Sequence, residues 1–354
     1  MSKSIFKQGG PHKIRKTGSD NYTFNISIPD DEQDRVAREC PDSSCSPGYF
    51  KIKLGTGITE KQTEVYCPYC RQANAPTEFM SKEQSRYAKD IVFQEAAKGI
   101  GQVMKDALGL GPSGRKQFGN GSISMSLEYQ PGRLSQVRRP FEEEMQRSVV
   151  CPLCGLDHIV YGLAVWCPDC GKDIFMSHVD AEFEVVRTIL GDVDRRRNEL
   201  GSRVAARDIE NCLEDTVSIF EAVLKTMLIR YLHDHGKTKE EIQILMGKKI
   251  RNGFQNPDRA SKIVKEHMQQ DLFKHITSTE NEFLKSTFEK RHPITHNLGV
   301  IDKKYMERAL ITANEGREIY ITKQEILELI VLCLNLLRNL HCKLFPENNN
   351  METT

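Results

Sequence analysis

The sequence lacks a long apolar run. Its most apolar stretch, residues 326–337, is interrupted by Glu328 and Asn335, and it is shorter than the roughly 20 residues that a membrane-spanning helix needs. The opening MSKSIFKQGGPHKIRKTG also lacks the apolar segment of a secretory signal peptide. We therefore expect a cytoplasmic protein with no membrane association.

An excess of charge of one sign is also missing. Lys and Arg number 50 and Asp and Glu number 49, which excludes a positive field over the whole chain and leaves only local groups to bind phosphate. The glycine-rich residues 109–121 lack the G-x-x-x-x-G-K-[ST] pattern of a phosphate-binding loop, so we interpret them as a linker. With 354 residues, the chain is expected to form two or three domains.

Cysteine is abundant in the first half of the chain. Eight of the 11 cysteines form four pairs: Cys40 with Cys45, Cys67 with Cys70, Cys151 with Cys154, and Cys167 with Cys170. In the cytosol disulfides are rare, so cysteines at this spacing predict metal binding. Four thiolates fill the coordination sphere of zinc and leave no position for an activated water. The pattern therefore predicts two structural zinc ions and no catalytic metal.

The two cysteine groups differ in regularity. Cys-Pro-x-Cys-Gly occurs twice in the second group, and residues 158–166 between the two copies are rich in β-branched and aromatic residues, which predicts a hairpin. With four thiolates available, His158 and His178 are not needed as ligands. In the first group a strand is expected at 49–54, and a pair of unrelated thiol-rich turns stays an alternative to a zinc ribbon. Lys51, Lys53, Tyr49 and Tyr69 are candidates either for nucleic-acid contact or for the solvated surface and small core of the module.

Long amphipathic helices are expected after residue 180. Apolar residues recur every three or four positions over 209–231 and again over 326–340, and shorter helices are expected at 239–246, 260–276 and 280–291. Ser81 with Gln84 and Thr322 with Glu325 form capping-box patterns, of which the first predicts a helix to about residue 98. Cys212, Cys333 and Cys342 are expected to be buried.

One segment carries candidate catalytic residues. It reads Arg291-His292-Pro293-Ile294-Thr295-His296-Asn297. Pro293 is expected to end the preceding helix near His292, which would let Arg291 and His296 converge on one phosphate. Imidazoles can remove and donate protons, and a guanidinium can stabilise the charge of a phosphorane, so these groups meet the needs of RNA cleavage without a metal. A buried, hydrogen-bonded histidine is the alternative interpretation.

This segment resembles the R-polar-x3-H motif of the HEPN superfamily, and the resemblance covers about residues 205–345. The resemblance implies an all-helical domain of the kind found in metal-independent ribonucleases of toxin, antiphage and RNA-processing systems. It also implies that Arg291 and His296 are the catalytic pair, that His292 orients them or contacts phosphate, and that Asn297 supports them. One chain offers only one set of these groups, so we expect a homodimer whose two copies together supply the acid and the base. Some relatives add an acidic residue on an earlier helix, for which Glu214 and Glu221 are both candidates.

These observations predict an α+β multidomain protein in which small zinc-ribbon β modules precede an all-α HEPN-like bundle. The expected segments are a leader (1–36), a first ribbon with a helix (37–108), a linker with short strands (109–147), a second ribbon (148–180), a connecting helix (181–204), the helical domain (205–346) and a tail (347–354). The protein is expected to be an endoribonuclease that leaves a 2′,3′-cyclic phosphate and acts in antiviral defence or as a toxin. A protein regulator is expected to control it. The alternative is a non-catalytic adaptor whose ribbons bind nucleic acid or protein.

Overall fold

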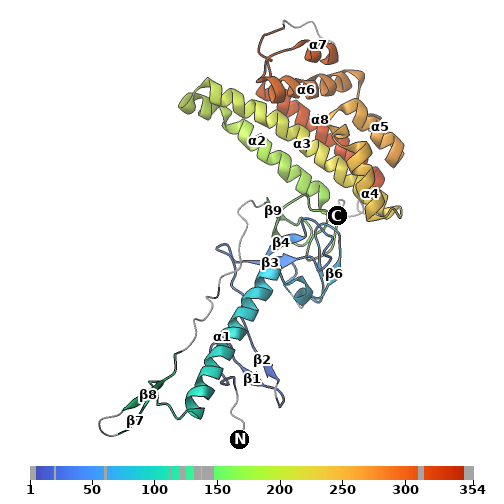
Figure 1. Cartoon of the computed structure of the whole chain (residues 1–354). Coiled ribbons are helices and arrows are strands. Elements are labelled where there is room, and N and C mark those ends of the chain that lie inside the picture. The colour runs from blue at the N-terminus through green and yellow to red at the C-terminus, as the bar shows by residue number, and fades with distance from the viewer. Residues whose placement is uncertain are drawn as a thin grey trace. The chain divides into compact units, whose positions relative to one another are not determined.

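The computed structural model combines small β-sheets with a helical C-terminal region (Figure 1). It describes residues 5–19, 21–59, 62–111, 113–119, 124–130, 137, 147–309 and 315–346. Among these residues, no helix is both long enough and apolar enough to cross a membrane. The chain divides into two compact units, of which the first comprises Met1–Cys67, Gln72–Val150 and Leu156–Tyr161, and the second Pro68–Arg71, Cys151–Gly155 and Gly162–Thr354. The segment boundaries expected from the sequence stay a prediction.

The first unit is built on a four-stranded antiparallel sheet of order β3-β4-β10-β9. Its strands are β3 (Arg35–Glu39), β4 (Tyr49–Lys53), β9 (Arg147–Val150) and β10 (Asp157–Val160). The strand expected at 49–54 is therefore present, but the hairpin expected over 158–166 is not. Residues 157–160 pair instead with β9 before them and with β4 about 100 residues earlier. The Cys151–Cys154 turn connects β9 to β10, so the hairpin that forms covers residues 147–160 instead of the expected 158–166.

Lys51 does not lie on the surface of this sheet. Its side chain is fully buried and its Nζ lies 3.0 Å from Asp31 Oδ2. Burial raises the pKa of Asp31, but hydrogen bonds from the Arg35 backbone and from Lys51 outweigh burial and lower it. A buried cation of this kind requires its carboxylate partner, so the expectation that Lys51 might contact nucleic acid is wrong.

Helix α1 (Lys82–Ala107) begins as expected and ends later than expected. Ser81 accepts from the backbone of Gln84, and the Gln84 side chain caps Ser81 in return, which confirms the capping box. The helix passes through Gly99 and Gly101 rather than ending at 98. A Cβ on Gly99 would lie 1.6 Å from the Ile5 carbonyl oxygen, and one on Gly101 would lie 2.9 Å from the Tyr129 hydroxyl. These glycines therefore allow other segments of the same chain to approach the helix closely, and they do not mark its end.

The remaining elements of the first unit are short. They are β1 (Arg15–Lys16), β2 (Tyr22–Thr23), β5 (Val65–Tyr66), β6 (Ala73–Asn74), the 3-10 turn η1 (Pro76–Phe79), β7 (Arg115–Phe118) and β8 (Met125–Glu128). The strands form three two-stranded antiparallel sheets, β1-β2, β5-β6 and β7-β8.

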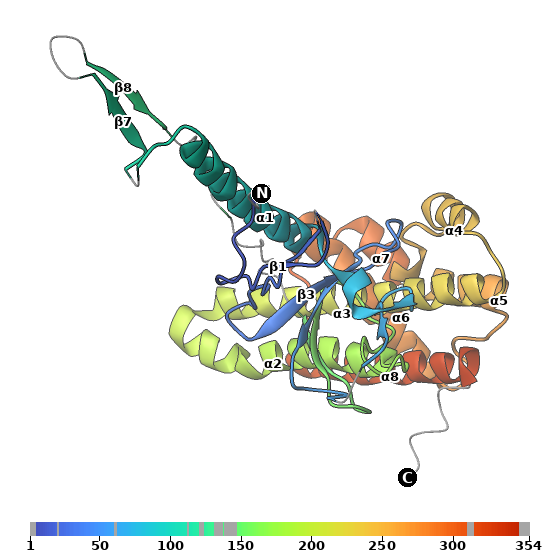
Figure 2. The same cartoon turned by 90° about the horizontal axis from the view of Figure 1, so that it is seen from below.

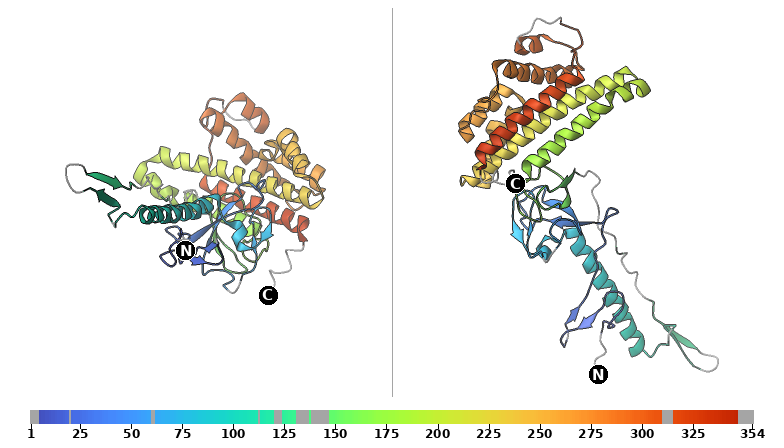
Figure 3. Two further views of the ribbon diagram at one scale, coloured as in Figure 1. Left: turned by 60° about the horizontal axis from the view of Figure 1, so that its bottom comes forward. Right: turned by 180° about the vertical axis from the view of Figure 1, so that it is seen from behind.

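The second unit is a helical bundle. Its long helices α2 (Phe175–Leu200), α3 (Ser202–Asp234) and α8 (Lys323–Leu344) lie side by side (Figures 2 and 3). The shorter elements are α4 (Lys239–Leu245), the π-helical turn η2 (Met246–Ile250), the 3-10 turn η3 (Gly253–Gln255), α5 (Pro257–Met268), α6 (Ser278–Asn297) and α7 (Lys303–Ala309). The expected helix at 260–276 ends at Met268, because Gln269 adopts a left-handed conformation with φ 55°.

The core of this bundle follows the apolar periodicity of the sequence. The two long periodic segments lie in α3 and α8. Of the capping box expected at the start of α8, one half is present: Thr322 accepts from the Glu325 backbone, whereas the Glu325 side chain accepts from Lys290. Cys212 and Cys333 are fully buried, and burial raises the pKa of Cys212 to about 12. Cys342 is exposed, so the expectation that it is buried is wrong.

Candidate functional site

The cysteines form two groups of four sulfurs. Cys40, Cys45, Cys67 and Cys70 make up the first group, and Cys151, Cys154, Cys167 and Cys170 the second. In each group all sulfur atoms lie within 4.8 Å of one another. Among the described residues, no other group of this kind was found, and neither His158 nor His178 belongs to one. Both groups could therefore hold a metal ion.

The sulfur separations match those of a tetrahedral metal site. Cys154 and Cys167 sulfurs lie 3.6 Å apart, and Cys45 and Cys67 sulfurs 3.7 Å apart. Four sulfurs at about 2.3 Å from a central zinc would be about 3.8 Å from each other, whereas a disulfide is about 2.05 Å long. The geometry is thus compatible with zinc and incompatible with disulfides.

Three of the cysteine turns share one backbone feature. The residue after the second cysteine, which is Arg71, Gly155 or Gly171, has a positive φ of 63°, 76° or 63°. In the second group this conformation directs the Gly155 and Gly171 amides to donate to the carbonyls of Cys151 and Cys167. The turn therefore folds each pair of thiols onto one side, as the Cys-Pro-x-Cys-Gly spacing predicted.

Both histidines near the second group are buried and hydrogen-bonded. The Ala164 amide donates to His178 Nδ1 at 2.8 Å, and His158 Nδ1 lies 3.3 Å from the Leu156 carbonyl oxygen. The Nδ1 atom of each ring is thus engaged in a structural hydrogen bond, and neither histidine belongs to a four-sulfur group.

The second cysteine group is joined to the helical bundle by three side chains, of which Asp173 and His341 are buried and Arg230 is half-buried. Asp173 follows Cys170 by three residues, and its Oδ2 lies 2.5 Å from Arg230 Nη1 and 3.5 Å from His341 Nε2. We call Asp173, Arg230 and His341 the Asp173 cluster. The Arg230 guanidinium also stacks on the Trp166 ring at 4.4 Å from its centroid, and the Arg71 guanidinium lies 4.3 Å from the same centroid. The metal-ligand turn and helices α3 and α8 therefore share one buried network.

We expect two tightly bound metal ions per chain. Cys45→Ser and Cys154→Ser should each lower the metal content to one ion, because each removes a sulfur from only one group. Elemental analysis of purified protein measures this number. Cys342→Ser is the matched control, since Cys342 belongs to neither group, and it should retain two ions. One ion or fewer in the unmodified protein would contradict metal binding by one of the groups.

The segment with the candidate catalytic residues forms the end of α6. The helix continues through Pro293 to Asn297, so the expectation that it ends near His292 is wrong. Loss of the proline N–H costs about 3 kcal/mol in a helix interior. Here Pro293 and Ile294 are both buried, and the Leu298 and Gly299 amides donate to the Pro293 carbonyl. Burial and these capping bonds offset the cost of the proline.

The continuous helix separates Arg291 from His296. Five residues along an α-helix turn a side chain by about 140° relative to the first. His292 and His296 are one turn apart, and their ring centroids lie 5.0 Å from each other. His296 is exposed and His292 is half-buried. Within one chain, the two histidines therefore come together, and Arg291 with His296 does not.

Arg291 is held by residues that the sequence did not indicate. Its Nη2 donates to Gln255 Oε1 at 2.8 Å, and Gln255 Nε2 donates to Glu221 Oε2 at 2.6 Å. Glu221, in turn, pairs with Lys225 at 2.6 Å. Gln255 lies on η3, and no sequence pattern linked it to α6. Glu221 is one of the two candidates, with Glu214, for an acidic residue on an earlier helix.

The other acidic candidate and Asn297 make structural contacts. The Thr295 hydroxyl donates to Glu214 Oε1 at 2.7 Å, which ties the last turn of α6 to α3. Asn297 Nδ2 donates to the Val300 carbonyl at 2.8 Å and closes the turn that follows the helix. Both contacts keep the histidine-bearing end of α6 in place.

Comparisons of the chain with protein-family models, with curated proteins and with solved structures found no match.

Proposed function

We propose that this protein is a metal-independent endoribonuclease that leaves a 2′,3′-cyclic phosphate and a 5′-hydroxyl. The observation that carries the proposal is the end of α6, where two histidine rings lie 5.0 Å apart directly after an arginine. The resemblance of this segment to the R-polar-x3-H motif supports the same chemistry. A homodimer is part of the proposal, because a second copy would supply a second set of these groups.

The reaction needs two proton transfers. One imidazole removes the proton of the 2′-hydroxyl, whose oxygen attacks phosphorus to form the cyclic phosphate. The bond from phosphorus to the 5′-oxygen breaks, and a second imidazole donates a proton to that oxygen. His292 and His296 are the two bases that one chain offers. Arg291 and His296 of one chain do not converge, so the guanidinium that stabilises the negative charge on the phosphorane is that of Arg291 in the second copy. Asn297 supports the helix end.

The metal ions have a different part in this proposal. We propose that each group of four thiolates holds zinc, which would leave no open position for water or substrate. Zinc thus stabilises the ribbons, and the ribbons recognise a target or a partner. The biological role we propose is that of a toxin or antiphage effector restrained by a protein regulator.

The test of this proposal uses two oligonucleotides of the same sequence in excess EDTA. The RNA should be cut to products with a 2′,3′-cyclic phosphate, whereas the all-2′-deoxy strand should stay intact, because it lacks the attacking hydroxyl. Mass spectrometry of the fragments identifies their ends. Cleavage of both strands, or cleavage only with added Mg²⁺, would contradict the mechanism. Binding of the RNA without cleavage would favour the alternative of a zinc-stabilised adaptor.

A further inference from the structure

The second unit carries a basic hollow away from the histidines. The hollow has a volume of about 780 Å³ and is formed by α3, α4, η2 and α5. Its lining residues are Lys225, Gln243, Met246, Gly247, Arg251, Asn252 and Arg259. Three of them are cations and two are amides, and no carboxylate is among these described residues. A hollow with this lining favours an anion that accepts several hydrogen bonds.

Two of the three cations are available to a ligand. Lys225 already pairs with Glu221, but within the described part of the chain neither Arg251 nor Arg259 lies within ion-pair distance of a carboxylate. Both arginines are exposed. Among the described residues, the Arg251 side chain makes one hydrogen bond, a long bond of 3.4 Å from Nε to the Gly247 carbonyl. Their guanidinium groups can therefore turn toward a phosphate without breaking an ion pair.

The backbone beside the hollow is unusual. Residues Met246–Ile250 form a π-helical turn, and Arg251 after it has φ 46° and ψ −119°. Positive φ at a non-glycine residue costs about 1–3 kcal/mol and persists where the surroundings require it. π-Helical turns recur at functional sites. This backbone brings Arg251 into the lining, and it also carries Lys248 and Lys249, which line a neighbouring hollow of about 410 Å³.

The hollow is connected to the proposed reaction site by side-chain bonds. Lys225 lines the hollow and pairs with Glu221, which accepts from Gln255, which accepts from Arg291. All of these residues belong to the second unit. These bonds place the hollow and Arg291 on one connected set of residues, so a strand held at the hollow would extend toward the end of α6.

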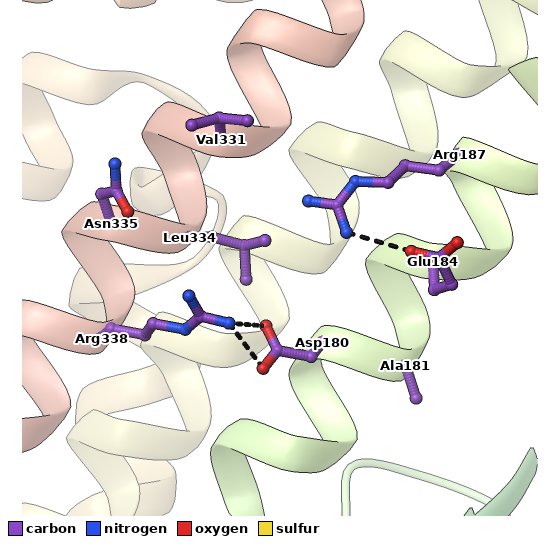
Figure 4. Close-up of a pocket in the computed structure, with 8 residues that line it drawn as sticks. All are labelled: Asp180, Ala181, Glu184, Arg187, Val331, Leu334, Asn335 and Arg338. Carbon is purple, nitrogen blue, oxygen red and sulfur yellow. Dashed lines mark hydrogen bonds and ion pairs between the residues drawn. The ribbon is translucent and has the colours of Figure 1, made fainter.

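A second depression of the same unit provides a contrast. It lies between α2 and α8 and has a volume of about 490 Å³. Figure 4 shows that both of its arginines are paired, Arg338 with Asp180 at 2.7 Å and Arg187 with Glu184 at 3.1 Å. Paired arginines attract phosphate weakly, so the two depressions differ in charge and not in size alone.

We propose that the basic hollow binds the phosphodiester backbone of the RNA strand that the protein cuts. The inference rests on the proposed nuclease function and adds where the strand is held outside the reaction site. Arg251 and Arg259 contact phosphates of that strand, and the contacts are independent of base sequence. They act on binding and not on the chemical step.

The test measures binding of an all-2′-O-methyl RNA, which cannot be cut, at several salt concentrations. Each phosphate contact contributes about 0.7 to the slope of log affinity against log salt for a single strand. Arg251→Gln with Arg259→Gln should therefore lower the slope by about 1.4 and weaken binding roughly 25-fold at 0.1 M salt. Arg259→Gln alone changes a residue on a regular helix, and it should lower the affinity for this RNA about fivefold at 0.1 M salt.

The matched control removes the same charge from the other depression. Arg187→Gln with Arg338→Gln should leave affinity and slope within about twofold of the unmodified protein, because these arginines are already paired. Binding of the hollow variants equal to that of this control would overturn the inference. Cleavage of unmodified RNA is measured in parallel. If the hollow variants lose binding and neither they nor the unmodified protein cleave RNA, the basic hollow is supported and the nuclease function is rejected. If the unmodified protein cleaves RNA and the hollow variants bind as tightly as it does, the nuclease function is supported and the role of the hollow is rejected.

Discussion

His296→Ala should lower the rate constant of RNA cleavage by about 10²- to 10⁴-fold, which is the contribution of a positioned acid or base. His296 is exposed at the end of α6, so its truncation should leave the bundle folded. Its loss removes one proton-transfer group while the basic hollow stays intact. Single-turnover cleavage at saturating RNA separates the chemical step from binding.

The control for this prediction is His233→Ala. His233 is also an exposed histidine near a helix end of the second unit, and it lies in the last turn of α3. It should cleave at the rate of the unmodified protein. Equal rates for His296→Ala and His233→Ala would remove His296 from the mechanism. A His292→Ala variant then shows whether one imidazole or two are required.

The second large effect concerns the Asp173 cluster. Asp173→Ala removes the nearer and buried carboxylate of Arg230 and leaves only Asp234, which is exposed and lies 3.9 Å away. Removal of one partner of a buried ion pair costs about 3–5 kcal/mol. We therefore expect a marked loss in the free energy of unfolding of the helical unit. Urea unfolding followed by far-UV circular dichroism measures this loss. Fluorescence of Trp166, the single tryptophan, reports on the cluster itself, because Arg230 stacks on its ring.

Asp180→Ala is the matched control for Asp173→Ala. Asp180 also pairs with an arginine, Arg338, but both side chains of that pair are exposed, and exposed pairs contribute about 0–1 kcal/mol. Metal content should stay at two ions in both variants, which separates the loss of the cluster from the loss of a metal site. Equal unfolding of the two variants would show that the buried network contributes little.

The contribution of Asp173 should also depend on pH. Burial raises the pKa of Asp173, but the hydrogen bond from His341 and the charge of Arg230 outweigh burial and lower it. A lowered pKa gives stability that is present above the unfolded value, about 3.9, and is lost as the pH falls through the lower folded value. The difference between the unmodified protein and Asp173→Asn should therefore shrink only in strong acid.

Local chemistry accounts for what the sequence predicted correctly. The capping box at Ser81 and the N-cap hydrogen bond of Thr322 depend on residues three apart, and the amphipathic faces of α3 and α8 on a repeat of three or four. Three of the four cysteine pairs lie in turns of five residues, and Cys40 with Cys45 lies in a stretch of six. Each of these patterns lies within one short stretch of chain, so the sequence displays it directly.

The failed predictions depend on contacts that a short stretch of chain does not contain. Pro293 continues α6 because burial and the capping bonds of Leu298 and Gly299 offset its cost. Gly99 lies inside a helix because Ile5 crosses it. Strand β10 pairs with β4 rather than with residues after Tyr161, and Gln255 meets Arg291 across 36 residues. Sequence patterns carry no signal for such distant partners.

The order of the four-stranded sheet has a practical consequence for dissecting the protein. A fragment that ends before β9 would keep only β3 and β4, and an isolated two-stranded ribbon is marginally stable in water. Its β4 edge would be left without β10 and open to association with other chains. A fragment that starts at β9 would lose the same pairing from the other side. Limited proteolysis between the cysteine groups should therefore yield two pieces that stay together until denatured.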